Sequence, residues 1–333
     1  MRTLLLKPNA AGIRRAASIL RKGGLVAFPT ETVYGLGANA FDAPACRKIF
    51  KAKRRPSDNP LIVHIARAGE LPRLAAEIPP SARKLIKRFW PGPLTIVLKK
   101  TKVVPFVVSG GLDTVAVRMP DHPVALKLIR AAWCPIAAPS ANVAGKPSPT
   151  DAQHVLEDLQ GRVDAVIDGG QTRHGVESTI VDLSGSVPVL LRPGAVTLEQ
   201  LRKVLGTVCV HASVQRPGMT RGKALSPGMK YRHYAPKAEV VVIRPPLSTR
   251  KLGKVLEGAK GRRVAVLTTR SRVKADAIVV VFPSVKAFAR RLFAYFRLLD
   301  KAGIGRIVVE GVPEKGLGLS LMNRVLKAAK KVV

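Results

Sequence analysis

Short apolar runs alternate with helical stretches along the chain, and this alternation constrains the fold more than any other feature of the sequence. It is most regular near the C-terminus, where VVVIRPP, RRVAVLTT, AIVVVFP and RIVVEG alternate with helices that begin at Ser248, Ser284 and Gly316. Apolar runs joined by helices are typical of parallel strands covered on both faces. Residues 238–333 are therefore expected to form a small parallel α/β domain of the Rossmann-like kind.

The first two hundred residues alternate less regularly, because some predicted strands follow each other without a helix between them. Helix starts are marked by capping residues, namely Asn9, Asp42 with Pro44, and Thr197 with Gln200. Further helices are expected over 81–90, 122–133 and 152–159, and strands over 24–28, 61–66, 94–100, 113–119, 134–140, 165–170, 178–184 and 187–194. This mixture predicts an α/β fold for residues 1–206, with an α+β-like mixed and twisted sheet.

Residues 207–237 separate these two predicted domains. The segment is rich in Gly, Pro, Ser and basic residues and lacks helical periodicity. It is long for a connection without structure of its own, so it is expected to be either a linker or a functional loop.

The net charge of +36, from 57 Lys and Arg against 21 acidic residues, favours a polyanionic partner such as tRNA or double-stranded RNA. A host whose proteins are all basic would explain the same charge, and aromatic residues, at 5%, are few for stacking bases. The cysteines Cys46, Cys134 and Cys209 lie far apart, which argues against a disulfide framework or a zinc site. With no apolar run long enough to span a bilayer, we expect a cytoplasmic protein without a membrane contact.

The stretch FPTETVYGLGANA contains Gly35 and Gly37 in a loose form of the dinucleotide-binding fingerprint. That fingerprint requires the first glycine to follow a strand directly and the loop to open a helix. Here the preceding strand ends at Phe28, and the next helix has its own start signal at Asp42. NAD binding is therefore not expected, and an irregular loop with positive φ at both glycines would account for them.

Cations and polar side chains gather in the stretch KAKRRPSDNPLIVHI. Lys53, Arg54 and Arg55 precede a stiff loop that contains Asn59, and His64 lies in the apolar run that follows. Arginine forks bind phosphate oxygens in pairs, and lysine adds a point charge. A solvated surface run is the alternative for the cations, and a core position is the more frequent one for a lone histidine.

Two further arginines, Arg118 and Arg192, stand at strand ends, where a charge must pair or face a cleft. The loop APSANVAGKPSPT offers hydroxyls and backbone N–H groups to an anion, and GVESTIVDL adds Ser178. No metalloprotease, nucleophile-elbow or P-loop motif is present. Cations and donors without a carboxylate pair suit phosphoryl or nucleotidyl transfer, so the residues alone predict a phosphate site of a nucleotide or nucleic acid.

At these residues the sequence resembles the YrdC/YciO family in its long two-domain form. The resemblance runs through FPTETVYGLG, KAKRRPSDNPLIVHI, FWPGPLTIVL, VAVRMPDHP, PSANVAGKPSPT, GVESTIVDL, LRPGA and SPGMKYRHYAPKAE. It implies a YrdC-like catalytic domain, a linker that acts as an active-site lid, and an accessory C-terminal domain. It also implies threonylcarbamoyl-AMP synthesis, in which L-threonine, bicarbonate and ATP give L-threonylcarbamoyl-adenylate and pyrophosphate.

The resemblance assigns the candidate site residues position by position. Those that resemble ATP contacts are Lys53, Arg55, Asn59, Thr114, Asn142, Thr150, Arg192 and Tyr234. Those that resemble threonine or bicarbonate contacts are Thr32, His64, Arg118, Ser140 and Ser178. Arg54 lies inside the family's Lys-x-Arg element and Ala144 stands where the family commonly has serine, so the cation that meets each phosphate is left open.

The implied mechanism has no protein nucleophile. Mg²⁺ would arrive with ATP, and a partner transferase would pass the threonylcarbamoyl group to the adenosine beside the anticodon of tRNA. The alternative is a non-catalytic, basic RNA-binding protein of the same fold. The linker motif SPGMKYRHYAP argues against that alternative, because a simple RNA platform does not need it.

Overall fold

The computed structural model describes residues 2–215, 224–229, 233–245, 248–259, 261–270, 273 and 275–333. The chain divides into two compact units. Unit 1 comprises Met1–Ala144 with Ser148–Lys230, and unit 2 comprises Gly145–Pro147 with Tyr231–Val333. Parts of the predicted linker, including Lys230 and Tyr231 of its KYRHY motif, lie outside the described residues.

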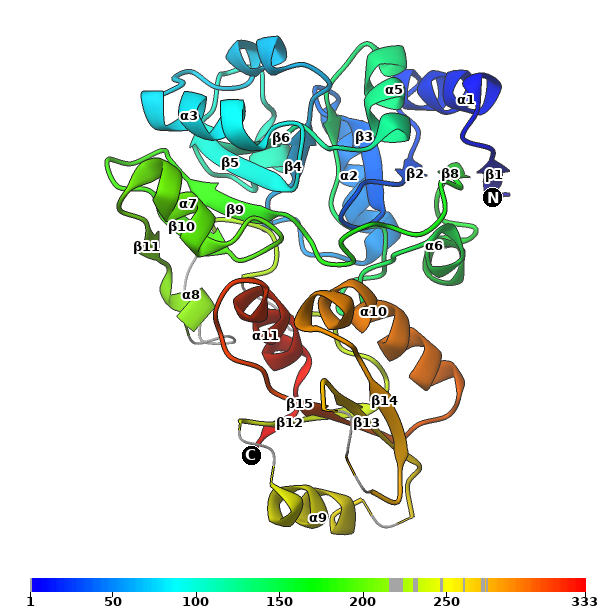
Figure 1. Cartoon of the computed structure of the whole chain (residues 1–333). Helices are drawn as coiled ribbons and strands as arrows, with labels where there is room; N and C mark the ends of the chain where they lie inside the picture. The colour runs from blue at the N-terminus through cyan, green and yellow to red at the C-terminus, as the bar shows by residue number, and fades with distance from the viewer. Residues whose placement is uncertain are drawn as a thin grey trace. The chain divides into compact units, whose positions relative to one another are not determined.

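Unit 1 is built on one mixed sheet of eleven strands (Figure 1). From one edge to the other, the strands are β1 (Leu4–Leu6), β8 (Ala165–Ile167), β2 (Val26–Phe28), β3 (Gly35–Asn39), β7 (Ile136–Ala137), β4 (Ile62–His64), β6 (Thr114–Arg118), β5 (Leu94–Lys99), β9 (Thr179–Asp182), β10 (Val189–Arg192) and β11 (Cys209–Val210). Parallel and antiparallel pairs both occur along this order, which confirms the predicted mixed sheet.

The helices of unit 1 begin largely where the capping residues predict. α1 (Ala10–Arg21) is capped by Asn9, α2 (Ala43–Lys53) by Asp42, and α7 (Leu198–Leu205) by the complete capping box of Thr197. The other helices are η1 (Ala68–Arg73), α3 (Pro80–Phe89), α4 (Phe106–Ser109), α5 (Pro123–Ala132), α6 (Ala152–Leu159) and α8 (Ala212–Gln215). α1 and α5 lie side by side, and their apolar faces form a core with residues of β2, β7 and β8 (Figure 1).

The two glycines of the FPTETVYGLGANA stretch are not in a loop. Gly35 and Gly37 belong to β3, which pairs antiparallel with β2, and neither has positive φ. A Cβ at Gly37 would lie 2.6 Å from Ile136 Cγ2 and 2.9 Å from Phe28 Cε1. The prediction of an irregular positive-φ loop is therefore wrong, because these glycines make room for neighbouring side chains instead of permitting a turn.

Several short elements escaped the sequence analysis. They are β1, β3, η1, α4, β11, α8 and, in unit 2, β16 (Lys331–Val332). Apart from β3 and the six-residue η1, each spans only two to four residues, too short to show a period of two or of 3.6. Three of the strands, β1, β3 and β16, pair with strands about 90 or more residues away in the sequence, as β1 does with β8.

Unit 2 contains a parallel sheet in the order β14 (Ile278–Val281), β13 (Val264–Thr268), β15 (Arg306–Glu310), β12 (Glu239–Ile243) and β16. α9 (Thr249–Glu257) covers one face, and α10 (Val285–Lys301) and α11 (Leu317–Ala328) cover the other (Figure 1). This confirms the small parallel α/β arrangement. Within the described residues of both units, no helix is long and apolar enough to cross a membrane.

We predict that Gly37→Ala destabilises the chain, because the added methyl group would overlap Ile136 and Phe28. Overpacking of this kind lowers the free energy of unfolding by about 1 to 3 kcal/mol. Urea unfolding of the full chain measures the effect. Gly69→Ala is the matched control, since a Cβ at Gly69 meets nothing within 4 Å. Equal stability of the two variants would contradict the steric role of Gly37.

Candidate active site

Three neighbouring strands of unit 1 bring polar side chains into one row. β4 and β6 pair in parallel with His64 opposite Arg118, and β6 and β5 pair antiparallel with Arg118 opposite Thr95. Residues directly opposite each other on paired strands project from the same face of a sheet. The register therefore gathers a histidine, an arginine and a threonine at one place on the sheet.

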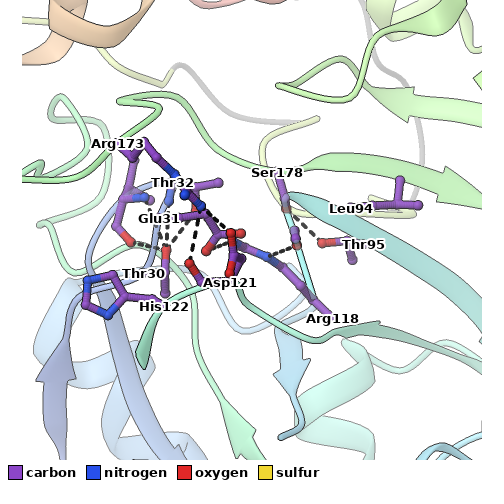
Figure 2. Close-up of polar contacts among 12 residues, drawn as sticks. Thr30, Glu31, Thr32, Leu94, Thr95, Arg118, Asp121, His122, Arg173 and Ser178 are labelled. Atoms are coloured by element: carbon purple, nitrogen blue, oxygen red, sulfur yellow. Dashed lines mark hydrogen bonds and ion pairs between the residues drawn. The ribbon is translucent and has the colours of Figure 1, made fainter. Parts of the chain in front are cut away.

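Arg118 is the centre of this row, and its side chain is only 4% exposed. Nη1 donates to Thr32 Oγ1 at 2.9 Å, and Nε donates to the carbonyl of Gly92 at 3.2 Å. Nη2 forms an ion pair with Glu31, whose Oε2 lies 2.7 Å away, as Figure 2 shows. The guanidinium is thus held by the turn that follows β2 and by the chain segment before β5.

Thr30 fixes the turn that carries Glu31 and Thr32. Its hydroxyl donates to the carbonyl of Val33 at 2.7 Å and lies 2.8 Å from the hydroxyl of Thr32. Since the Thr30 proton is used on Val33, Thr32 must donate to Thr30 while it accepts from Arg118. The two threonines of this turn therefore form a chain of hydrogen bonds that ends on the buried guanidinium, and Glu31 between them adds an ion pair.

Ser178 is held from two sides at the start of β9. Its hydroxyl lies 2.7 Å from Thr95 Oγ1 and accepts from Arg192 Nη2 at 3.1 Å. Arg192 Nε also donates to the Ser178 carbonyl at 3.0 Å. Arg192 is buried and positions Ser178 in this structure. Its predicted contact with a phosphate of ATP stays a prediction.

His64 is buried beside Arg118 and packs edge-on against Phe28, with 6.1 Å between the ring centroids. Burial, reinforced by the positive charge of Arg118, lowers the pKa of His64 from 6.5 to about 3. Its Nδ1 lies 3.2 Å from the carbonyl of Ile62. His64 is therefore neutral at physiological pH and serves the row as a polar group without charge.

The three consecutive cations of the KAKRRP stretch have different surroundings. Lys53 is 2% exposed, and its Nζ donates to the carbonyls of Ser140 and Asn142, each at 2.5 Å. Burial, with the nearby charge of Arg55, lowers the pKa of Lys53 well below its usual value. Nζ of Lys53 thus anchors the loop after β7, so the expected role of Lys53 as a cation for ATP gains no support from its position.

Arg55 Nη2 donates to the carbonyls of Asn59 and Pro60, at 3.1 and 2.9 Å. Arg54 ends α2 in the left-handed conformation, with φ of 52°, and is exposed. Asn59 is fully buried, and neither atom of its side-chain amide has a hydrogen-bond partner among the described residues. A buried amide without partners is rare in proteins, so a ligand contact at Asn59 is physically reasonable and stays a prediction.

The remaining predicted residues of unit 1 spread around this row. Ser140 Oγ donates to Asn142 Oδ1 at 2.6 Å, so these two lie together beside Lys53. Thr150 is buried, with its hydroxyl 3.3 Å from His154 Nδ1. Thr114 begins β6 while Arg118 ends it, which separates them by about 13 Å along the strand.

Tyr234 is the one predicted site residue in unit 2. Its ring stacks on Phe293 of α10, with 5.2 Å between centroids, and the guanidinium of Arg324 of α11 lies 5.8 Å from its centroid. These contacts anchor the described end of the linker within unit 2. Closure of Tyr234 over a nucleotide stays a prediction.

Two polar residues of the row were missed by the sequence analysis. Glu31 lies in the FPTETVYGLGANA stretch but was given no role, and Thr95 was taken as an ordinary strand residue. An acid inside an otherwise apolar and hydroxyl-rich approach was a usable signal for Glu31. Thr95 had none, because its place beside Ser178 depends on the pairing of β5 with β9.

We predict that His64 makes the fold sensitive to acid. Between pH 6.5 and about 3 the unfolded chain binds a proton at this residue that the folded chain does not, so stability falls as pH falls. The contribution lost between pH 7 and pH 5 is about 2 kcal/mol. In urea unfolding at both pH values, His64→Gln should lose that much less stability than the wild type. An identical loss of unfolding free energy in the two proteins would show that His64 does not cause the acid sensitivity.

We also predict that Lys53→Met lowers the free energy of unfolding by about 2 to 3 kcal/mol, because two carbonyls lose their donor. Lys51→Met, an exposed position on the same helix, should change it by less than about 0.5 kcal/mol. Chemical denaturation of both variants makes the comparison. A loss for Lys53→Met no larger than that of its control would mean that the ammonium group does not hold the loop.

Comparison with known proteins gives matches over nearly the whole chain. The threonylcarbamoyl-AMP synthase of Pyrococcus abyssi is 54% identical over 321 residues, which are 95% of this chain and 94% of the relative. The threonylcarbamoyl-AMP synthase of Bacillus subtilis is 47% identical and covers 97% of this chain and 94% of its own length. The crystal structure of P. abyssi Sua5 complexed with L-threonine matches with a TM-score of 0.92 and 51% identity, over 100% of this chain and 99% of that one.

Family models divide the chain in the same order as the structure. The Sua5/YciO/YrdC model, described as "Telomere recombination", matches residues 18–194, and the model described as "Threonylcarbamoyl-AMP synthase, C-terminal domain" matches residues 196–330. Both halves of the chain are therefore accounted for by one family. The chain belongs to the Sua5/YciO/YrdC family, in the long two-domain form of the threonylcarbamoyl-AMP synthases.

Proposed function

We propose that the chain synthesises L-threonylcarbamoyl-adenylate from L-threonine, bicarbonate and ATP, with release of pyrophosphate. The observation that carries the proposal is the 54% identity to the P. abyssi synthase across both domains. The buried row around Arg118 supports it, because a guanidinium fixed at the end of a strand suits a substrate carboxylate. In class, the enzyme would be a nucleotidyltransferase.

Threonine would bind at Arg118 and His64 of the row and at Thr32 and Ser178, which contact the row, with Ser140 as a further contact. Arg118 would pair with the threonine carboxylate. Since His64 is neutral, it adds no second positive charge beside Arg118. Its imidazole can still form a hydrogen bond with the bound threonine. The hydroxyls of Thr32 and Ser178 are already oriented by protein partners, so little ordering would be needed on binding.

ATP would bind along the loops that flank this row. In unit 1 its proposed contacts are Arg55, Asn59, Thr114, Asn142, Thr150 and Arg192, and Lys53 acts indirectly by holding the loop of Ser140 and Asn142. Guanidinium groups suit the phosphate oxygens, which become more negative as pyrophosphate leaves.

The chemistry needs no protein nucleophile. Bicarbonate would take a proton from the threonine ammonium and give CO₂ and water. The free amine would then add to CO₂ and lose a second proton to water, which forms a carbamate. An oxygen of this carbamate would attack the α-phosphorus while the bond to pyrophosphate breaks. Mg²⁺ would accompany the ATP phosphates. The described residues bring together no three His, Cys, Asp or Glu side chains that could hold a metal, so no step is assigned to a protein-bound ion. The residues of the row would bind and orient threonine and exclude water from the product.

A separate transferase would consume the adenylate and modify tRNA. The charge of +36 favours contact between this chain and RNA, through a salt-sensitive attraction to phosphates. RNA binding would be a separate property of the chain, and it would not depend on the synthase activity.

The deciding experiment is pyrophosphate release from ATP by the purified full chain. We expect release only when L-threonine and bicarbonate are both present, and little release with L-serine or with no amino acid. Release that ignores the amino acid would indicate a different substrate. No release, together with tight and salt-sensitive RNA binding, would favour a non-catalytic RNA-binding protein.

We predict that Arg118→Ala lowers threonine-dependent pyrophosphate release at least about 100-fold, because a charge-assisted carboxylate contact of about 3 kcal/mol is lost. Arg130→Ala removes an exposed arginine from α5 and should keep the wild-type rate. Circular dichroism verifies that both variants remain folded. Wild-type turnover by folded Arg118→Ala would exclude the proposed threonine site.

A further inference from the structure

Buried polar atoms in the row around Arg118 lack hydrogen bonds. Glu31 is 1% exposed, and neither of its carboxylate oxygens has a hydrogen-bond partner among the described residues. The same holds for Nη2 of Arg118, although it lies 2.7 Å from Glu31 Oε2. The two groups are near enough for an ion pair, but their geometry is not that of a hydrogen bond. Buried polar atoms without partners are rare and point to a missing ligand or water.

Glu31 is not needed to orient Arg118. Hydrogen bonds from Nη1 to Thr32 and from Nε to the Gly92 carbonyl already fix two sides of the guanidinium plane. Glu31 itself is fixed through its backbone, because His174 N donates to its carbonyl at 2.8 Å. The guanidinium is therefore held by hydrogen bonds, and the carboxylate is confined by burial on a fixed backbone. Both keep hydrogen-bonding capacity to spare, which is the condition for recognising a ligand.

The spare capacity matches the two charges of an α-amino acid. The ammonium and carboxylate of such a molecule are attached to one carbon, so its opposite charges lie as close together as those of Arg118 and Glu31. Nη2 can donate to a carboxylate, and the oxygens of Glu31 can accept from an ammonium. A ligand that bears only a carboxylate would meet the negative charge of Glu31 at short range.

We propose that Glu31 binds the α-ammonium of L-threonine while Arg118 binds its α-carboxylate, so that this ion pair selects a free α-amino acid. The inference rests on the proposed function and deepens it, because it assigns the amine recognition that Arg118, Thr32, His64 and Ser178 leave open. Once this ammonium has lost a proton to bicarbonate, its nitrogen is the atom that must be carbamoylated, so holding it decides where the new C–N bond forms.

The test is isothermal titration calorimetry of the full chain with L-threonine and with (3R)-3-hydroxybutanoate, which is threonine without its amino group. We expect Glu31→Gln to weaken L-threonine binding roughly 10- to 100-fold, as expected for a charge-assisted hydrogen bond. The same variant should leave hydroxybutanoate binding unchanged or make it tighter. Glu77→Gln, an exposed acid paired with Lys99, should match the wild type for both ligands.

An equal loss for both ligands would mean that Glu31 acts only by positioning Arg118, and an unchanged affinity for threonine would mean that it has no role. Either result overturns this inference and leaves the proposed function standing. Failure of the wild type to bind threonine would reject the proposed function itself. If Glu31→Gln does not fold, the two affinities of the wild type test the inference. The wild type must bind L-threonine at least about 10-fold more tightly than hydroxybutanoate, and equal affinities would overturn the inference.

Discussion

The burial of Arg118 is the constraint on which the architecture of the site depends. Moving a charged group out of water costs several kcal/mol unless opposite charge and hydrogen bonds replace the lost solvent. Unit 1 supplies these from segments far apart in the sequence, namely the turn of Thr32 and Glu31 and the carbonyl of Gly92. The guanidinium thereby ties the end of β6 to the loop after β2 and to the approach to β5. His64 is neutral for the same reason, since a second buried cation beside Arg118 would have no compensating charge.

Features fixed by near neighbours in the chain were predictable. The caps at Asn9, Asp42 and Thr197 involve residues within three positions, so the sequence displays both partners of each hydrogen bond. The two sheets were also foreseeable in kind, because the spacing of apolar runs distinguishes a mixed from a parallel arrangement. Gly35 and Gly37 were misjudged because their surroundings include Ala138 and Ile136 respectively, each about a hundred positions away. Crowding by side chains from distant parts of the chain cannot be recognised from the residues next to a glycine.

The candidate site shows the same division between local and distant information. Motifs indicated which residues matter, and Thr32, His64, Arg118 and Ser178 do gather around one row. The partner of each residue was not predictable, because it depends on strand register. Lys53 resembled one member of a solvated basic run, yet the loop of Ser140 and Asn142 closes over it. Glu31 and Thr95 matter through contacts with Arg118 and Ser178 that only the folded sheet creates.

The pairing of β1 with β8 has a consequence for the order in which the chain can fold. Leu4 lies opposite Ala165, and β8 also separates β1 from β2 within the sheet. A ribosome that adds about 5 to 20 residues per second needs roughly 10 to 30 s to reach β8 after β1 has been made. During that interval β2 can form its hairpin with β3, but its other edge and all of β1 have no strand to pair with. The nascent N-terminus must therefore remain unpaired until half of the protein has been synthesised, a period in which its open strand edges are exposed to chaperones and to aggregation.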